Sequence, residues 1–155
     1  MSRDPEFLAG LDAQRAADVL ALGEPVRLAA GDVLFSLGSE AKHLFLVERG
    51  LVTLTMPMQV AGREEDVLIE ERGPGQTLGW SSLIPPHRFI LTARVSVESE
   101  LLSFARDRLL DHFHEHPEVG YAISRNVAAI VGQRLQVFQA MWLRQMQQLV
   151  NKAHA

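Results

Sequence analysis

The stretch from Val26 to Ala105 most constrains the fold, because short apolar runs are repeatedly interrupted there by glycine. In two runs every second residue is apolar: Val52, Leu54 and Met56, and then Ala93, Val95 and Val97. This period of two indicates strands with one buried face. The glycines that separate the runs are Gly31, Gly38, Gly50, Gly62, Gly73, Gly75 and Gly79. About eight candidate strands follow at intervals of roughly 8–12 residues, a spacing that suggests an antiparallel sandwich or barrel.

Two short turns are expected to join neighbouring strands. Arg49-Gly50 predicts a tight hairpin between the runs 43–48 and 51–57, and Ala61-Gly62-Arg63 predicts a second turn. The charged triplets beside the second turn, Glu64-Glu65-Asp66 and Glu70-Glu71-Arg72, are interpreted as solvated hairpin residues.

Helical patterns flank the strand region on both sides. An apolar face predicts a helix from Glu6 to Leu22, ended by Gly23, Glu24 and Pro25. A short helix is predicted from Asp107 to His116, where Pro117 stops it, and a long one from about Glu118 to Asn151. We therefore expect one domain over residues 1–155, with a helical segment 1–25, a β-barrel 26–105 and C-terminal helices 106–155.

The long helix contains a heptad seam. Its members are Val131, Leu135, Phe138, Trp142, Gln145 and Leu149, spaced 4, 3, 4, 3 and 4 residues apart. This seam predicts a homodimer through the long helix, with the polar Gln145 fixing its register. The alternative is a helix that lies on the sheet of its own chain.

Composition excludes several classes of protein. The 155 residues include no cysteine, which excludes disulfides, thiolate zinc sites and a cysteine nucleophile. No run reaches the ~18 apolar residues of a membrane span, and no secretory signal is recognised, so a cytoplasmic protein is expected. The net charge of −4 argues against direct nucleic-acid binding.

Several segments of the strand region occur in an order that resembles a known family. They are Gly31-Asp32-Val33-Leu34-Phe35, Gly38, Leu44-Phe45-Leu46-Val47-Glu48-Arg49-Gly50-Leu51-Val52, Gly73-Pro74-Gly75-Gln76-Thr77-Leu78-Gly79 and Ala93-Arg94-Val95. With the flanking helices, they resemble the cyclic-nucleotide-binding domain of the CRP/FNR (catabolite activator and fumarate-nitrate regulator) family. The resemblance implies a mainly-β fold, an eight-stranded antiparallel jelly-roll barrel (double-stranded β-helix). It further implies an N-terminal helix and a long C-terminal dimerisation helix.

The resemblance also implies a ligand site between Gly79 and Ala93. In the family, a glutamate after the glycine binds the ribose hydroxyl, and an arginine followed by Ser or Thr binds the cyclic phosphate. The matching positions here are Trp80, Leu91 and Thr92, so only Thr92 agrees. The backbone of a short helical turn, here Ser81-Ser82-Leu83-Ile84, would face the phosphate. The candidate ligand-binding residues are Gly79, Trp80, Ser81, Ser82, Leu83, Arg88, Leu91, Thr92 and Ala93.

The missing arginine weakens the case for a cyclic nucleotide. A hydrogen bond to a charged group contributes roughly 1.5–3 kcal/mol, so its loss costs on the order of 10–100-fold in affinity. Arg88 or Arg94 is a candidate replacement, if either points inward. Trp80 and Phe89 are interpreted either as an aromatic platform for a ligand ring or as residues that fill the cavity.

Three functional hypotheses follow. The first is a non-catalytic sensor without a cofactor, which binds a small anionic ligand such as a cyclic nucleotide and signals through the long helix. The second is a ligand-free dimeric interaction module. The third is a cupin-like metalloenzyme, which the few barrel histidines, His43 and His87, make weak.

Two further features argue against other partners. In the run His112, His114 and His116, only the first and last share a helix face, so solvated histidines are expected and no metal site. The family's transcription factors have a helix-turn-helix after the long helix. Only residues 151–155 follow it here, so direct DNA binding is not expected.

Overall fold

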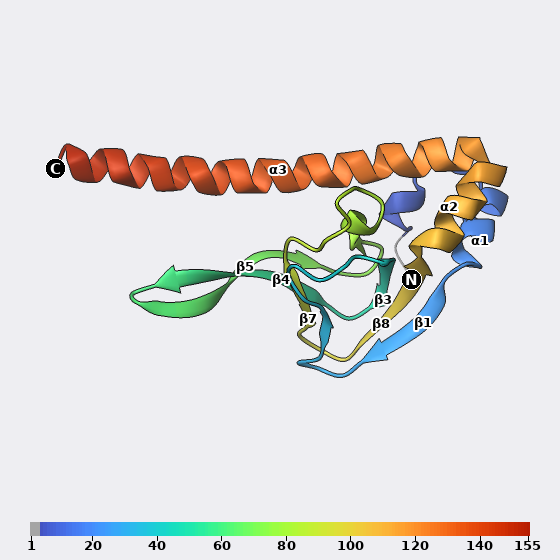
Figure 1. Ribbon diagram of the computed structural model, residues 1–155, viewed down its shortest axis with the longest axis horizontal. Helices are drawn as coiled ribbons and strands as arrows, with labels where there is room; N and C mark the ends of the chain where they lie inside the picture. The colour runs from blue at the N-terminus through green and yellow to red at the C-terminus, as the bar shows by residue number, and fades with distance from the viewer. Residues whose placement is uncertain (1–3) are drawn as a thin grey trace.

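Two antiparallel sheets pack against each other beside one long helix in the computed structural model, which describes residues 4–155 (Figure 1). One sheet has the strand order β1-β8-β3-β6 and the other β2-β7-β4-β5. The strands are β1 (Glu24–Leu28), β2 (Val33–Phe35), β3 (His43–Arg49), β4 (Val52–Val60), β5 (Arg63–Arg72), β6 (Thr77–Leu78), β7 (Thr92–Val95) and β8 (Ser99–Ala105). The expected mainly-β, antiparallel architecture with flanking helices is confirmed.

Alternating side chains from both sheets form the core between them. Val52 and Leu54 on β4 are buried and lie opposite Val95 and Ala93 on β7. These residues belong to a cluster, here called the barrel core, that also contains Phe35, Ala41, Phe45, Val47, Leu78, Phe89, Leu91 and Leu101. The period of two therefore predicted the burial of Val52, Leu54, Ala93 and Val95 correctly. It was wrong for Val97, which follows the end of β7 and is 48% exposed.

The predicted hairpin at Arg49-Gly50 is wrong. The strands on either side of Gly50 do not pair, because β3 lies in one sheet and β4 in the other. Gly50 has a φ of 102°, and a Cβ there would lie 2.7 Å from the Cα of Ser99. The glycine thus allows the chain to cross between the sheets where the backbone of β8 is very close.

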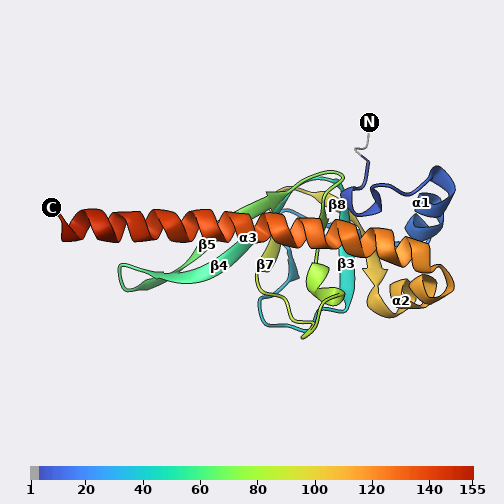
Figure 2. The ribbon, with the colours of Figure 1, turned by 90° about the horizontal axis from the view of Figure 1, so that it is seen from above.

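The turn at Ala61-Gly62 is a true hairpin, as predicted. It joins β4 to β5, whose register pairs Val60 with Arg63. Both turn residues have positive φ, 51° for Ala61 and 79° for Gly62, as a two-residue turn of type I′ requires. The hairpin projects from the sheet in the same direction as the C-terminal half of the long helix (Figures 1 and 2).

The N-terminal segment is not the single helix that the apolar pattern predicts. It consists of a 3-10 turn, η1 (Glu6–Leu8), and a short helix, α1 (Ala13–Leu20). Gly10 between them has a φ of 84°, which interrupts the helical path. Asp12 then starts α1 as its N-cap, because its Oδ1 accepts a 2.8 Å hydrogen bond from the backbone N–H of Arg15.

The C-terminal helices agree closely with the prediction. They are α2 (Arg106–Glu115) and α3 (Pro117–Ala153), and Pro117 occupies the first turn of α3, where it needs no amide partner. The first half of α3 packs against η1 and α2 and covers the outer face of the first sheet. There it contributes to a second cluster, here called the helical core, that contains Phe7, Leu8, Val19, Leu44, Leu46, Phe104, Leu109, Val119, Ile123 and Val127. Within residues 4–155, no helix combines the length and apolarity that a membrane crossing would need.

The heptad seam of α3 is divided between two environments. Val131 packs against the helical core and Phe138 against the barrel core, so for these residues the alternative of a helix on its own sheet holds. Leu135, Trp142 and Leu149 are instead 67%, 61% and 59% exposed. Gln145 is exposed as well. The seam does not act as one unit within a single chain.

Candidate ligand-binding site

A left-handed glycine places the candidate site next to the end of β6. Gly79 has a φ of 81° and precedes the 3-10 turn η2 (Trp80–Ser82), which begins one residue earlier than the helical turn expected at Ser81-Ser82-Leu83-Ile84. A Cβ at Gly79 would lie 2.9 Å from the carbonyl oxygen of His43, so a larger residue does not fit without movement of β3. The glycine thereby brings Trp80 and Ser81 against the sheet.

A small cavity lies between η2, the segment just before β7, and α3. Its lining residues are Phe35, Leu54, Gly79, Trp80, Ser81, Phe89, Ile90, Leu91 and Arg134. Its volume of about 10 Å³ is close to the room that one water molecule needs. The rings of Phe35 and Phe89 stack on each other as part of its wall, with centroids 3.7 Å apart and planes at 8°. The aromatic side chain of Phe89 therefore fills space that a ligand would have to take.

Only part of the predicted site surrounds this cavity. Gly79, Trp80, Ser81 and Leu91 line it. The other predicted residues of η2 and β7 lie near but outside the lining: Leu83 packs on the helical core, Ala93 belongs to the barrel core, and the Oγ1 of Thr92 accepts a 3.0 Å hydrogen bond from the amide of Leu37. Ser82 is fully buried, and its Oγ has no hydrogen-bond partner within residues 4–155.

The two arginines expected to replace the missing phosphate ligand both lie outside the cavity. Arg88 is exposed, and its Nη1 donates a 3.0 Å hydrogen bond to the carbonyl of Gly38. Arg94 is exposed too, and its Nη1 donates a 2.7 Å bond to the carbonyl of Gly31. The reason is local: alternation along β7 turns position 94 away from the barrel core, and the loop before β7 holds Arg88 on the surface.

The charge at the cavity comes from α3 instead. Arg134 is only 6% exposed and lines the cavity beside Trp80, with its guanidinium carbon 5.9 Å from the ring centroid of Trp80. Its Nε donates a 2.7 Å hydrogen bond to Oε2 of Glu70 on β5. Burial lowers the pKa of Arg134, and the attraction of Glu70 opposes that shift.

Sequence reasoning missed Arg134, although a signal was present. Arg134 lies four residues after Ile130 and four before Phe138, and both of these face the body of the protein. A charged side chain at that spacing within an apolar helix face is expected to be buried beside a partner.

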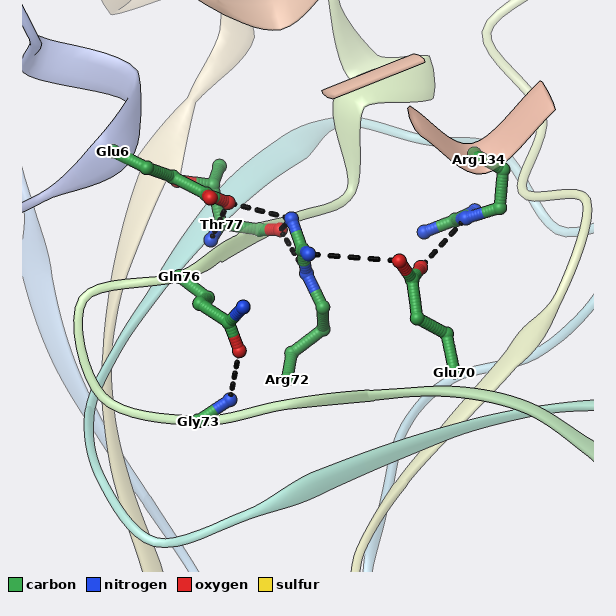
Figure 3. A network of polar contacts seen from close by, with 7 residues as sticks. All are labelled: Glu6, Glu70, Arg72, Gly73, Gln76, Thr77 and Arg134. Atoms are coloured by element: carbon green, nitrogen blue, oxygen red, sulfur yellow. Dashed lines mark hydrogen bonds and ion pairs between the residues drawn. The ribbon is translucent and has the colours of Figure 1, made fainter. Parts of the chain in front are cut away.

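The ion pair is part of a buried network of alternating charge (Figure 3). Arg72 is 3% exposed, and its Nη2 donates a 2.5 Å hydrogen bond to Glu6 of η1. Its Nη1 lies 3.6 Å from Oε1 of Glu70, whose other oxygen accepts from Arg134. Nε and Nη2 of Arg72 also donate to the carbonyl of Thr77. The interpretation of Glu70 and Arg72 as solvated hairpin charges is wrong. The C-terminal end of β5 contacts both η1, through Glu6, and α3, through Arg134.

Metal ligands do not gather in the part of the chain that the structure describes. No three His, Asp or Glu side chains there could hold a metal ion. The rings of His112 and His116 lie 4.7 Å apart at the end of α2, without a third such residue.

A model of the cyclic nucleotide-binding domain matches residues 25–116, from β1 to the end of α2. The chain belongs to this family. Its match to the family ends before α3, so Arg134 lies outside the part of the chain that the family model describes.

Solved structures of regulators share this cyclic nucleotide-binding fold. The N-terminal domain of a transcriptional regulator from Streptomyces coelicolor is 28% identical, with a TM-score of 0.70, over 83% of this chain and 89% of the other. The global regulator CLP of Xanthomonas campestris is 20% identical, with a TM-score of 0.75, over 86% and 64%. The Thermus thermophilus catabolite activator protein is 23% identical, with a TM-score of 0.74, over 92% and 63%.

A curated protein is similar over the same region. Glutaminase 2 of Bradyrhizobium diazoefficiens is 30% identical over 133 residues, which cover 83% of this chain and 19% of that protein. The chain thus spans about a fifth of the length of this relative. The similarity concerns one portion of a larger enzyme, while the structural relatives are regulatory proteins.

Proposed function

We propose that this chain is a non-catalytic, ligand-sensing regulatory domain whose output element is α3. The observation that carries the proposal is that α3 contributes Arg134 to the wall of the candidate cavity. The same helix packs Phe138 against the barrel core. Membership of the cyclic nucleotide-binding domain family and the similarity to a transcriptional regulator's N-terminal domain support a regulatory role.

The shared wall provides a physical route from ligand to helix. A ligand larger than a water molecule must displace Phe89, Trp80 or Arg134, because these side chains fill the site. Arg134 belongs to α3, and Trp80 contacts α3 because the guanidinium of Arg134 lies over its ring. If the ligand binds more tightly when α3 is in one of two positions, it raises the fraction of molecules with α3 in that position.

The ligand we propose is a small anion related to the family's cyclic nucleotides. The family's arginine position is Leu91 here and its glutamate position is Trp80, so the recognition chemistry differs from that of the family motif. Thr92 keeps the family's residue type, and its hydroxyl oxygen accepts a hydrogen bond from the amide of Leu37. The specificity of this site is therefore proposed to differ from that of a standard cyclic-nucleotide site.

We further propose that α3 forms a homodimer. Leu135, Trp142 and Leu149 are spaced seven residues apart, so they lie within about 40° of one another around the helix. All three are exposed, and Met146 lies between them on the same face. A second copy of α3 is the surface that a repeating apolar stripe of this kind fits. Dimerisation of this stripe would connect the position of α3 to an output.

A second function, a dimeric interaction module that binds no small ligand, is favoured by the size of the cavity. At about 10 Å³ the cavity is far smaller than a nucleotide, and the stacked rings of Phe35 and Phe89 form part of its wall. In that case the exposed stripe on α3 would carry the whole function.

The test is a thermal-shift titration of the chain with cyclic AMP, cyclic GMP and cyclic di-GMP up to millimolar concentration. A ligand at 100 times its Kd stabilises the folded state by about 2.7 kcal/mol, which raises the Tm by several degrees. A saturable rise with one of them supports the sensor. If none of the three raises the Tm, the interaction module is the better description.

A further inference from the structure

We infer that Arg134 is the anion-binding residue of this site, and that it takes the place of the family arginine that is absent at Leu91. This inference rests on the proposed sensing function. It assigns the charge that recognises the ligand to the long helix rather than to the loop before β7. The ligand class it implies is a small molecule with a phosphate or carboxylate group.

The hydrogen bonding of Arg134 leaves its binding edge free. Within residues 4–155, only Nε donates a hydrogen bond, to Glu70, and the terminal Nη1 and Nη2 have no acceptor. This pair of terminal nitrogens is the edge that binds phosphate or carboxylate with two parallel hydrogen bonds. A buried guanidinium with an unused edge on a cavity wall is suited to an anion.

The charge balance of the cavity points to the same ligand class. Arg134 is the single charged residue among the residues that line the cavity in the described chain. The other lining residues are apolar, apart from Ser81. An anion there would meet a positive charge in surroundings of low polarity, where ionic hydrogen bonds are strong. A cation would be repelled by the guanidinium, and a neutral apolar ligand would offer no acceptor to its terminal N–H groups.

Glu70 and Arg72 act as positioning residues for Arg134. The carboxylate of Glu70 holds Nε and so fixes the plane of the guanidinium (Figure 3). Glu70 is itself held by Arg72, which bonds Glu6 and the carbonyl of Thr77. Glu70 thus neutralises the resting Arg134 without covering its terminal edge.

Trp80 offers an optical reporter for the test. The chain has two tryptophans, Trp80 and the exposed Trp142, so the variant Trp142→Phe leaves Trp80 as the only one. The indole of Trp80 lies beside Arg134, and its fluorescence should change when an anion binds there. The probes are sodium phosphate, sodium acetate, cyclic AMP and cyclic GMP, each titrated at constant ionic strength against sodium chloride. Comparing phosphate with acetate shows which of the two anionic groups binds. Comparing phosphate with the cyclic nucleotides shows whether the site prefers a free ion or a cyclic phosphate.

The decisive comparison is between two matched variants in this single-tryptophan background. Arg134→Met removes the charge and keeps much of the volume, and it should weaken the Kd of the responding probe by about 10- to 100-fold. Arg144→Met, an exposed position on the same helix, should leave the Kd unchanged. Arg134→Lys keeps the charge but not the two-pronged edge, and an intermediate Kd is expected even if Arg134→Met folds poorly.

Glu70 is tested by rescue. Glu70→Gln retains an oxygen that accepts the Nε bond and should bind the probe more tightly than Glu70→Leu, which retains none. If Glu70 only stabilised the fold, both variants would have a lower Tm, and their Kd values for the probe would be equal.

Three results would overturn the inference. Equal Kd values for the parent and Arg134→Met would mean that the sensing function holds and the anion is bound elsewhere. Loss of binding in Arg88→Ala but not in Arg134→Met would assign anion binding to Arg88 in the loop before β7. No saturable response of Trp80 to any of the four probes would reject both the Arg134 inference and anion sensing.

Discussion

Nε of Arg134 on α3 lies 2.7 Å from Oε2 of Glu70 on β5, and this bond ties the long helix to the sheet through two buried side chains. The side chains are 7% and 18% exposed, so water screens the pair only weakly. We therefore expect the contact to contribute measurably to stability as well as to the arrangement of the site.

The first prediction is a coupling energy between these two residues. In a double-mutant cycle of Arg134→Met and Glu70→Gln, unfolding in urea should reveal a coupling of about 1–3 kcal/mol. Arg144→Met on the exposed face of α3 serves as the control and should show no coupling to Glu70→Gln. Additive effects of the two central substitutions, within about 0.5 kcal/mol, would contradict a working ion pair.

The second prediction concerns the chain crossing at Gly50. Both Gly50 and Gly31 have left-handed φ values, 102° and 92°, but a Cβ would meet the backbone of Ser99 only at Gly50. Gly31→Ala should cost about 1–2 kcal/mol from the backbone conformation alone. Gly50→Ala should cost about 1–3 kcal/mol more, because β8 must move. Equal urea midpoints for the two variants would argue against the close approach.

The third prediction is that the apolar stripe of α3 holds two copies together. We expect the parent chain to sediment as a dimer at micromolar concentrations and the double variant Trp142→Glu, Leu149→Glu to sediment as a monomer. Gln148→Glu adds a charge to a different face of the same helix and should leave the dimer intact. A monomeric parent chain at these concentrations would contradict the dimer proposal.

The fourth prediction is a pH dependence at the start of α1. The pKa of Asp12 is lowered, chiefly by the hydrogen bond from the Arg15 backbone N–H. Because the folded-state pKa lies below the unfolded one, Asp12 stabilises the protein fully above its unfolded pKa. That contribution is lost as the pH falls through the folded pKa.

The measurement for Asp12 is the Tm of the parent and of Asp12→Asn between pH 7 and the acid limit of reversible folding. Asparagine can still cap the helix but cannot ionise. The parent should have the higher Tm near neutral pH, and the difference should shrink on acidification. A difference that stays constant with pH would mean that the charge of Asp12 has no role.

Much of the fold was predictable because its signals are local. The alternation of Val52 and Leu54, the paired turn residues Ala61 and Gly62, and the stop at Pro117 each act over a few residues. They are therefore visible in one sequence. The resemblance of the glycine-bounded segments to a known family supplied the rest of the architecture, and the match over residues 25–116 agrees with it.

The candidate site was predictable only in part. Gly79 and the turn after it are defined by adjacent residues, so the sequence indicated where one wall of the cavity lies. Arg88 and Arg94 were reasonable substitutes for the missing arginine, because both are near Leu91 in the chain. Proximity in sequence did not decide which arginine faces the cavity, and both are exposed in the structure.

The sequence by itself determined most strands, the two C-terminal helices and the family, because hydrophobic periodicity and turn chemistry are properties of short segments. Only the tertiary structure decided that β3 and β4 separate into different sheets at Gly50. It also decided that Arg134 meets Glu70, a residue 64 positions earlier in the chain. The physical reason is that the rotation of α3 against the barrel fixes which of its side chains are buried, and that rotation depends on the packing of Val127, Ile130 and Phe138 rather than on any local pattern.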